Sequence, residues 1–118
     1  MKTKIAVFVS GGGTNLQALI DKKAAGGIED GELALVLSSR ADAYALERAK
    51  AAGIPTAVVS KKECKDAKEF EEKILAELSA HGIEMIVLAG FMSILSESFT
   101  SRFPRRILNV HQIGRAHV

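Results

Sequence analysis

The sequence has a single cysteine, Cys64, and no tryptophan. One cysteine can form neither an internal disulfide nor a thiolate metal site, which fits a reducing cytosol. Cys64 also lies in the charged run of residues 61–66, a pattern typical of a solvated loop, so a role as nucleophile is not favoured. We therefore expect a cytoplasmic protein without a metal centre.

The sequence also lacks a long apolar run and an excess of charge of either sign. The apolar stretch near the start ends after Val9 at three glycines, and this is too short for a secretory signal or a membrane span. Lysine and arginine total 16 against 14 acidic residues, far from the concentrated basic face that nucleic acid requires. We expect small molecules as partners, with no nucleic acid and no membrane.

A chain of 118 residues has the size of one ordinary domain, but it is short for a complete α/β enzyme. Its composition, 47% hydrophobic and 25% charged, is typical of a globular protein. We expect one domain or part of one. The sequence does not set the oligomeric state.

Five short apolar runs alternate with segments of helical periodicity. The runs are continuously apolar, which is typical of parallel strands buried on both faces. They cover residues 5–9, 33–37, 56–59, 85–89 and 107–110, and helices are expected from residue 14 to the glycines at 26–27, over 44–52, from about 70 to 82, and over 96–102. The pattern predicts an α/β fold, a Rossmann-like three-layer open sheet that is mostly parallel.

Polar residues and glycines set the expected ends of the helices. Thr14 and Asn15 are good N-cap residues for the first helix, and Ser96 is one for the last. Gly53 closes the second helix, and His81 is favourable near the C-terminus of the third.

In open parallel sheets, ligands bind beyond the carboxyl ends of the strands, where the strand order reverses. Three segments at the carboxyl ends of predicted strands carry glycine or unusual polar residues, namely residues 10–15, 90–95 and 109–111. We expect them to meet at one crevice.

Residues 10–15 are a candidate phosphate loop, because glycines let backbone N–H groups approach an anion and the next helix begins with partial positive charge. The dinucleotide fingerprint is incomplete: Leu16 stands where its third glycine would be, and Ser38-Ser39-Arg40 follows the second strand in place of an acidic residue. No Walker lysine follows. A phosphate monoester on a small substrate is favoured, and a tight structural turn is the alternative.

Of the other two segments, the first is apolar and the second carries polar side chains. Residues 90–95 are apolar and predict either a hydrophobic cover over the sheet or one wall of a pocket for a flat heterocycle. In the run 107–111, period-two alternation puts Asn109 and His111 on one face at the carboxyl end of the strand. A hydrogen-bond donor and a proton-transfer group would then be neighbours, unless both merely face water.

Together these segments resemble those of the phosphoribosylglycinamide formyltransferase family, the folate-dependent transferases of purine biosynthesis and one-carbon metabolism. The matching segments are V-S-G-G-G-T-N-L-Q-A at 9–18, A-D-A at 41–43 with L-E-R-A at 46–49, V-L-A-G-F-M-x-I-L at 87–95, and L-N-x-H at 108–111. Each alone is weak, but their combination in this order over residues 4–111 is specific.

The resemblance implies transfer of a formyl group from 10-formyltetrahydrofolate to the amino group of glycinamide ribonucleotide, without a metal. It implies that Gly13, Thr14 and Asn15 hold the substrate phosphate. It also implies that Asn109 and His111 are the catalytic pair. The folate would contact Asn109 and the four residues Met92, Ser93, Ile94 and Leu95.

The sequence departs from the family at several positions. Ser93 and Ser39 replace a basic residue and an asparagine, which leaves backbone contacts possible, and the role of Lys68 toward the folate stays open. After His111 the family continues with Pro-Ser-Leu and later supplies an aspartate that orients the histidine. This chain continues with Q-I-G-R-A-H-V.

We interpret residues 1–111 as the N-terminal part of the formyltransferase domain and residues 112–118 as a non-native tail. The tail would be encoded by CAG ATC GGA AGA GCA CAC GTC, which resembles a sequencing adapter. We expect the fragment itself to be inactive. The alternatives are a formyltransferase for another amine, such as a nucleotide sugar or an aminoacyl-tRNA, and a non-catalytic nucleotide-binding Rossmann-like module.

Overall fold

The computed structural model describes residues 3–24, 31–89, 91, 96–103 and 106–110. Within these ranges the chain forms a five-stranded sheet of order β3-β2-β1-β4-β5, with every described strand pair parallel. The strands are β1 (Thr3–Val9), β2 (Gly31–Ser38), β3 (Thr56–Val58), β4 (Met85–Ala89) and β5 (Ile107–Val110). The helices are α1 (Thr14–Ala24), α2 (Tyr44–Ala51), α3 (Ala67–Ala80) and α4 (Glu97–Thr100), with a 3-10 turn at Lys61–Glu63. The predicted α/β, Rossmann-like fold is confirmed.

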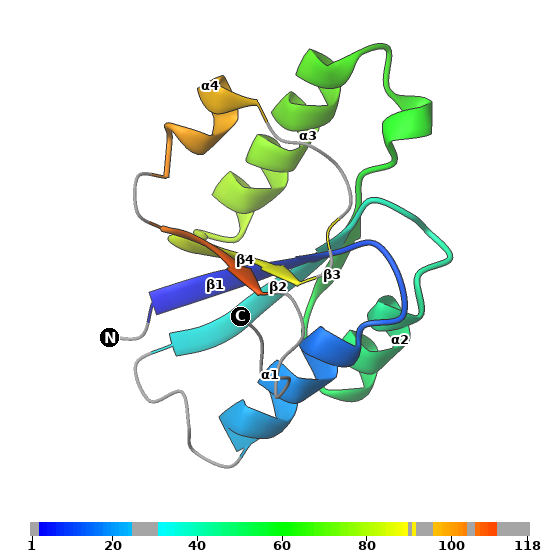
Figure 1. Ribbon diagram of the computed structural model, residues 1–118, viewed down its shortest axis with the longest axis vertical. Coiled ribbons are helices and arrows are strands. Elements are labelled where there is room, and N and C mark those ends of the chain that lie inside the picture. The colour runs from blue at the N-terminus through cyan, green and yellow to red at the C-terminus, as the bar shows by residue number, and fades with distance from the viewer. Residues whose placement is uncertain (1–2, 25–30, 90, 92–95, 104–105, 111–118) are drawn as a thin grey trace, which may run out of the picture.

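The sheet lies between two layers of helices, with α1 and α2 on one face and α3 and α4 on the other (Figure 1). Alternate residues of β1 supply both cores: Val7 and Val9 pack toward α1 and α2, and Ala6 and Phe8 pack toward α3 and α4. Because both faces are covered, the inner stretches of the central strands, residues 5–9, 33–37 and 85–89, are continuously apolar.

An irregularity in the pairing of β1 and β2 keeps both faces apolar. Ile5 pairs with Leu33, but the next residue, Ala6, pairs with Leu35, so Ala34 is an extra residue in β2. Leu33 therefore packs in the core beside α1 and α2, while Leu35 packs in the opposite core. The extra residue reverses the alternation, as a β-bulge does.

The predicted boundaries hold best where glycine or proline flanks an apolar run. Strands β4 and β5 match their predicted ranges, and β3 is one residue shorter. Helix α1 begins at Thr14, as predicted, but neither Thr14 nor Asn15 is its N-cap. The carbonyl of Gly13 accepts the first helical hydrogen bond, from the Gln17 N–H at 2.8 Å, so Gly13 occupies the N-cap position in place of Thr14 or Asn15.

Ser96 is the N-cap of α4, as predicted, and its Oγ accepts from the Phe99 N–H. The helix is shorter than expected, because Arg102 and Phe103 donate to the carbonyls three residues earlier and form a tight turn. The Glu71 carboxylate on α3 accepts from both the N–H and the Oγ of Ser96, at 2.6 and 2.7 Å. This contact joins α3 to the beginning of α4.

The charged run before α3 is only partly a solvated loop. Asp66 is the N-cap of α3, and its carboxylate accepts from the Glu69 N–H at 2.9 Å. Cys64 is half-buried against the core on the α3 side, and its Sγ lies 3.3 Å from the Ser60 carbonyl. The expectation of a solvated loop over residues 61–66 therefore does not hold at Cys64. His81 is the C-cap residue of α3, where it was predicted.

Candidate functional site

The strand order reverses between β1 and β4, which are neighbours at the centre of the sheet. The chain moves outward from β1 to β2 and β3 on one side, then returns to place β4 and β5 on the other. Beyond the carboxyl ends of such a pair, the loops separate and leave a crevice. The glycine loop (residues 10–15) follows β1, the apolar segment (residues 90–95) follows β4, and Asn109 lies near the end of β5. The described carboxyl ends of β1, β4 and β5 therefore lie at one edge of the sheet.

In the glycine loop, a neighbouring helix holds each of the carbonyls of Gly11, Gly12 and Gly13. The Gly11 carbonyl accepts from the Ala45 N–H at 3.1 Å, and the Gly12 carbonyl accepts from the Arg48 Nε at 2.8 Å. The Gly13 carbonyl accepts from Gln17. Helix α2 has Ala43 at its N-cap, without a side-chain cap, so the Gly11 carbonyl satisfies one of the free N–H groups of its first turn.

The carbonyls of Gly11, Gly12 and Gly13 are held, but their N–H groups donate no backbone hydrogen bond within the part of the chain that the structure describes. A trans peptide directs its N–H away from its C=O, so a carbonyl held by α2 turns the next N–H away from α2. Gly11 and Gly12 are exposed. The N–H groups of Gly12 and Gly13 therefore turn away from α2, an arrangement that is compatible with an anion-binding loop.

Gly13 is required by its conformation and by its neighbour. Its φ is +83°, and an added Cβ would lie 2.7 Å from the Ala45 Cβ and 2.8 Å from the Ala45 Cα. Gly11 and Gly12 have open space around the same position. The close approach of Gly13 to α2 depends on two small residues, one from each segment.

The end of β2 adds a polar junction beside the loop. The Ser10 and Ser39 hydroxyls lie 2.8 Å apart, and the Ser39 N–H donates to the Val9 carbonyl at 3.2 Å. The buried Ser38 hydroxyl donates to the Arg40 carbonyl at 2.7 Å. These contacts fix the chain between β2 and α2, which carries Ala45 and Arg48.

The Arg40 side chain pairs with Asp42. Its Nε and Nη2 donate to the two carboxylate oxygens at 3.1 and 3.0 Å. The hydrogen bond and charge of Arg40 hold the pKa of the Asp42 carboxyl below its ordinary value of 3.8. Both side chains are more than half exposed, so the pair stabilises the loop only modestly.

Phe91 is the one described residue of the apolar segment that follows β4. Its ring packs edge-on against Phe8 of β1, with ring centroids 5.3 Å apart. At this position the segment covers the sheet, as one of its two predicted interpretations states. The folate-contact positions Met92, Ser93, Ile94 and Leu95 lie outside the described residues.

Asn109 lies in β5, where its Cα pairs with that of Leu88 in β4, and Val110 pairs with Ala89. Its backbone is therefore two strands away from Phe8 of β1, in the same row of the sheet. His111 lies outside the described residues, as do the side chains of Asn109, Thr14 and Asn15. The roles assigned to these side chains stay predictions. Lys68 is exposed near the start of α3.

No role was predicted for Arg48, which lies beside the loop. Arg48, on α2, donates from Nη1 to the Gln17 Oε1 at 3.2 Å in addition to its bond with Gly12. It thereby joins α2 to both the glycine loop and α1. The L-E-R-A match contains Arg48, but nothing in the sequence indicates that its side chain reaches a loop 36 positions earlier.

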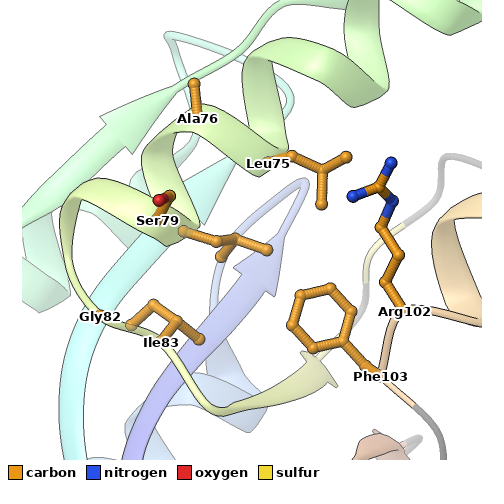
Figure 2. Close-up of a pocket in the computed structure, with 8 residues that line it drawn as sticks. Leu75, Ala76, Ser79, Gly82, Ile83, Arg102 and Phe103 are labelled. Carbon is orange, nitrogen blue, oxygen red and sulfur yellow. The ribbon is translucent and has the colours of Figure 1, made fainter.

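A separate depression of about 630 Å³ lies between the end of α3 and the turn after α4 (Figure 2). Its lining is mostly apolar, and Arg102 lies beside Leu75 and Phe103. Gly82 and Ile83 of this lining precede β4, so the depression lies at the amino end of that strand. It is therefore distinct from the predicted crevice.

The described ranges contain no group of three or more His, Cys, Asp or Glu side chains that could hold a metal ion. No helix in these ranges is long and apolar enough to cross a membrane.

Comparison with known proteins places these features in a family. Residues 3–113 match the model of the formyl transferase family. The chain is 47% identical over 108 residues to a phosphoribosylglycinamide formyltransferase from Haemophilus influenzae, covering 92% of this chain and 50% of that protein. It is 39% identical over 110 residues to the human trifunctional purine biosynthetic protein adenosine-3, covering 93% of this chain and 11% of that protein.

Among solved structures, the fold is similar to that of glycinamide ribonucleotide transformylase 1 from Geobacillus kaustophilus. The TM-score is 0.87 at 35% identity, over 92% of this chain and 57% of that one. The chain therefore spans about half the length of the single-function relatives that it matches.

Proposed function

The chain belongs to the formyl transferase family, and we propose that the full-length protein transfers a formyl group from 10-formyltetrahydrofolate to the amine of glycinamide ribonucleotide in purine biosynthesis. The names of the Haemophilus and human relatives support this reaction and pathway. A cytoplasmic location is part of the proposal, since a phosphorylated substrate is too polar to cross a membrane unaided.

One observation carries the substrate assignment. The carbonyls of Gly11, Gly12 and Gly13 are all engaged by helices, while the N–H groups of the same residues donate no backbone hydrogen bond in the described part of the chain. A phosphate monoester accepts several such hydrogen bonds and gains further from the N-terminus of α1. In the proposal, Gly13, Thr14 and Asn15 bind the phosphate of glycinamide ribonucleotide.

The donor occupies the neighbouring part of the crevice. Met92, Ser93, Ile94 and Leu95 follow β4, and Asn109 lies on the adjacent strand β5. In the proposal, the first four form an apolar wall with backbone hydrogen-bonding groups, which suits a flat heterocycle. The strand order supports this division, because β4 and β5 lie on one side of β1 and α2 follows β2 on the other.

The proposed reaction requires no nucleophile from the protein. The substrate amine attacks the formyl carbon, a new C–N bond forms, and the carbonyl oxygen becomes negatively charged in a tetrahedral intermediate. Asn109 and protonated His111 donate hydrogen bonds to this oxygen. The oxygen then regains its double bond to the formyl carbon as the bond between that carbon and the folate nitrogen breaks, and His111 passes a proton to that nitrogen. The attacking amine, positively charged after the attack, releases one proton to water, and His111 takes up a proton again before the next turnover.

The test is a formyl-transfer assay on the full-length protein. It would contain 10-formyltetrahydrofolate and glycinamide ribonucleotide, with formylated product and released tetrahydrofolate measured together. The proposal requires equal amounts of both products. A matched reaction with the dephosphorylated ribonucleoside should be much slower, because the loop would lose its anion.

The alternative functions give different results in this assay. Preference for a nucleotide sugar or an aminoacyl-tRNA in competition with glycinamide ribonucleotide would identify a formyltransferase for another amine. Nucleotide binding with neither folate binding nor formyl transfer would identify a non-catalytic module. Either result would contradict the proposed function.

The proposal extends to the residues after His111. We propose that residues 1–111 belong to the formyltransferase domain, that residues 112–118 are non-native, and that the natural protein continues with Pro-Ser-Leu and a later aspartate. The 118-residue chain alone is then expected to be inactive. Sequencing the source gene beyond the His111 codon tests this, and genomic DNA that encodes Q-I-G-R-A-H-V followed by a stop codon would contradict it.

A further inference from the structure

Arg48 makes three contacts around the glycine loop. Its Nε donates to the Gly12 carbonyl at 2.8 Å, and its Nη1 donates to the Gln17 Oε1 at 3.2 Å. Its guanidinium carbon lies 5.1 Å from the centre of the Tyr44 ring, within the range of a cation–π interaction. The half-buried guanidinium is thus held on several sides, although α2 places it near the surface.

The first of these contacts controls one peptide unit. The Gly12 carbonyl and the Gly13 N–H belong to the same planar peptide, and in its trans form they point in opposite directions. A bond from Arg48 to the carbonyl therefore fixes the direction of the N–H. Between two glycines, a peptide has few steric barriers that would hold it in one orientation.

The preceding peptide has its own support. The Gly11 carbonyl is held by the Ala45 backbone N–H, and this bond fixes the direction of the Gly12 N–H. A substitution of Arg48 leaves that backbone donor in place. The two neighbouring peptides therefore differ in one respect that an experiment can use: a side chain holds one, and the backbone holds the other.

We propose that Arg48 is a positioning residue of the phosphate loop, which holds the Gly12–Gly13 peptide so that its N–H faces the bound phosphate. The proposal rests on the proposed function for the identity of the phosphorylated substrate. Arg48 acts through the loop, and its fork of donors suits this role because it spans Gly12 and Gln17 together.

The test uses the full-length protein labelled with ¹⁵N, and inorganic phosphate as the probe. Residual dipolar couplings of the Gly12 and Gly13 N–H groups report the two peptide orientations without ligand. In Arg48→Ala, the Gly13 coupling should fall toward an averaged value, while the Gly12 coupling should stay as in the wild type. Phosphate affinity, followed by the amide shifts of Gly12 and Gly13, should fall about tenfold, the loss expected for one charge-assisted hydrogen bond.

Two matched variants separate orientation from charge. Arg48→Lys keeps the charge and one donor, so phosphate affinity should recover to within about threefold of the wild type. Recovery should be incomplete, because a single ammonium group cannot span Gly12 and Gln17 as the fork does. Lys50→Ala removes an equal charge from an exposed position on the same helix and should leave the phosphate affinity unchanged. Thermal unfolding of each variant shows that the fold is retained.

Each outcome decides the proposal. It is supported if the Gly13 coupling and the phosphate affinity both fall in Arg48→Ala and the loss persists at high salt. It is overturned if either is unchanged, if the wild-type loop binds no phosphate, or if high salt removes the difference, since long-range charge attraction is screened by salt. None of these measurements involves folate, so failure of the formyl-transfer assay alone would reject the proposed function and not the role of Arg48.

Discussion

Gly13 and Ala45 meet so closely that no side chain fits between them. A Cβ on Gly13 would lie 2.7 Å from the Ala45 Cβ, and the φ of Gly13 is +83°. Ala45 is completely buried, and its N–H holds the Gly11 carbonyl. The position of α2 and the shape of the loop after β1 therefore depend on each other.

Gly13→Ala is expected to destabilise the full-length protein. The left-handed conformation costs a residue with a Cβ about 1–2 kcal/mol, and forcing a methyl group against packed backbone costs about 1–3 kcal/mol more. The two effects together predict a loss of about 2–5 kcal/mol in the free energy of unfolding, measured in urea. Gly11→Ala is the matched control, because its added Cβ meets nothing within 4 Å, and its effect should stay within about 0.5 kcal/mol. Equal stability of the two variants would contradict the close approach.

The Arg40–Asp42 pair predicts a specific dependence of stability on pH. The pKa of the Asp42 carboxyl is lowered in the folded protein, so the unfolded chain binds this proton more readily. The pair therefore contributes stability above pH 3.8, and this contribution is lost as pH falls through the folded-state pKa. Wild type should unfold at a higher urea concentration than Asp42→Asn at neutral pH, by a small margin that shrinks in acid and in high salt. A margin that grows on acidification would refute this account.

Glu71 should stabilise the beginning of α4 through its two hydrogen bonds with Ser96. In Glu71→Ala, the free energy of unfolding should fall by about 1 kcal/mol, because charge-assisted bonds near the surface are partly screened. Hydrogen exchange at the Phe99 amide, which Ser96 caps, should accelerate by more than the global loss explains. Glu72→Ala removes the exposed neighbouring carboxylate and serves as the control. Equal exchange at Phe99 in the two variants would contradict this role.

The fold was largely predictable because its signals are local. A strand buried on both faces is a continuous apolar run. Both ends of β4 were therefore predicted to the residue, because a glycine follows the apolar run and marks where it stops. The extra residue Ala34 in β2 was not predictable, since an uninterrupted apolar run looks the same with or without a bulge. The end of α4 was misplaced because the local sequence does not separate its last turn from the tight turn at Phe103.

The site was less predictable because its contacts join distant segments. Thr14 was predicted as an N-cap from its residue type, but Gly13 takes that position, and its neighbour Ala45 comes 32 positions later in the sequence. Arg48 looks like any surface arginine on a helix until the fold places α2 beside the loop. Residue type suggested the chemistry, whereas only the packing of α2 identifies which carbonyls are held.

The catalytic prediction concerns His111 and Asn109 in the full-length protein. If both donate to the oxygen of the tetrahedral intermediate, His111→Ala and Asn109→Ala should each lower kcat on the order of a hundredfold or more, with smaller changes in the KM for glycinamide ribonucleotide. The two losses should combine to less than their product, since both side chains would act on one oxygen in one step. Leu108→Ala, at the residue before Asn109 on β5, is the control for damage to the strand, because Leu108 is 51% exposed. Near-normal turnover in His111→Ala would remove His111 from the mechanism, and an equal loss in Leu108→Ala would show that the strand, and not the pair, sets the rate.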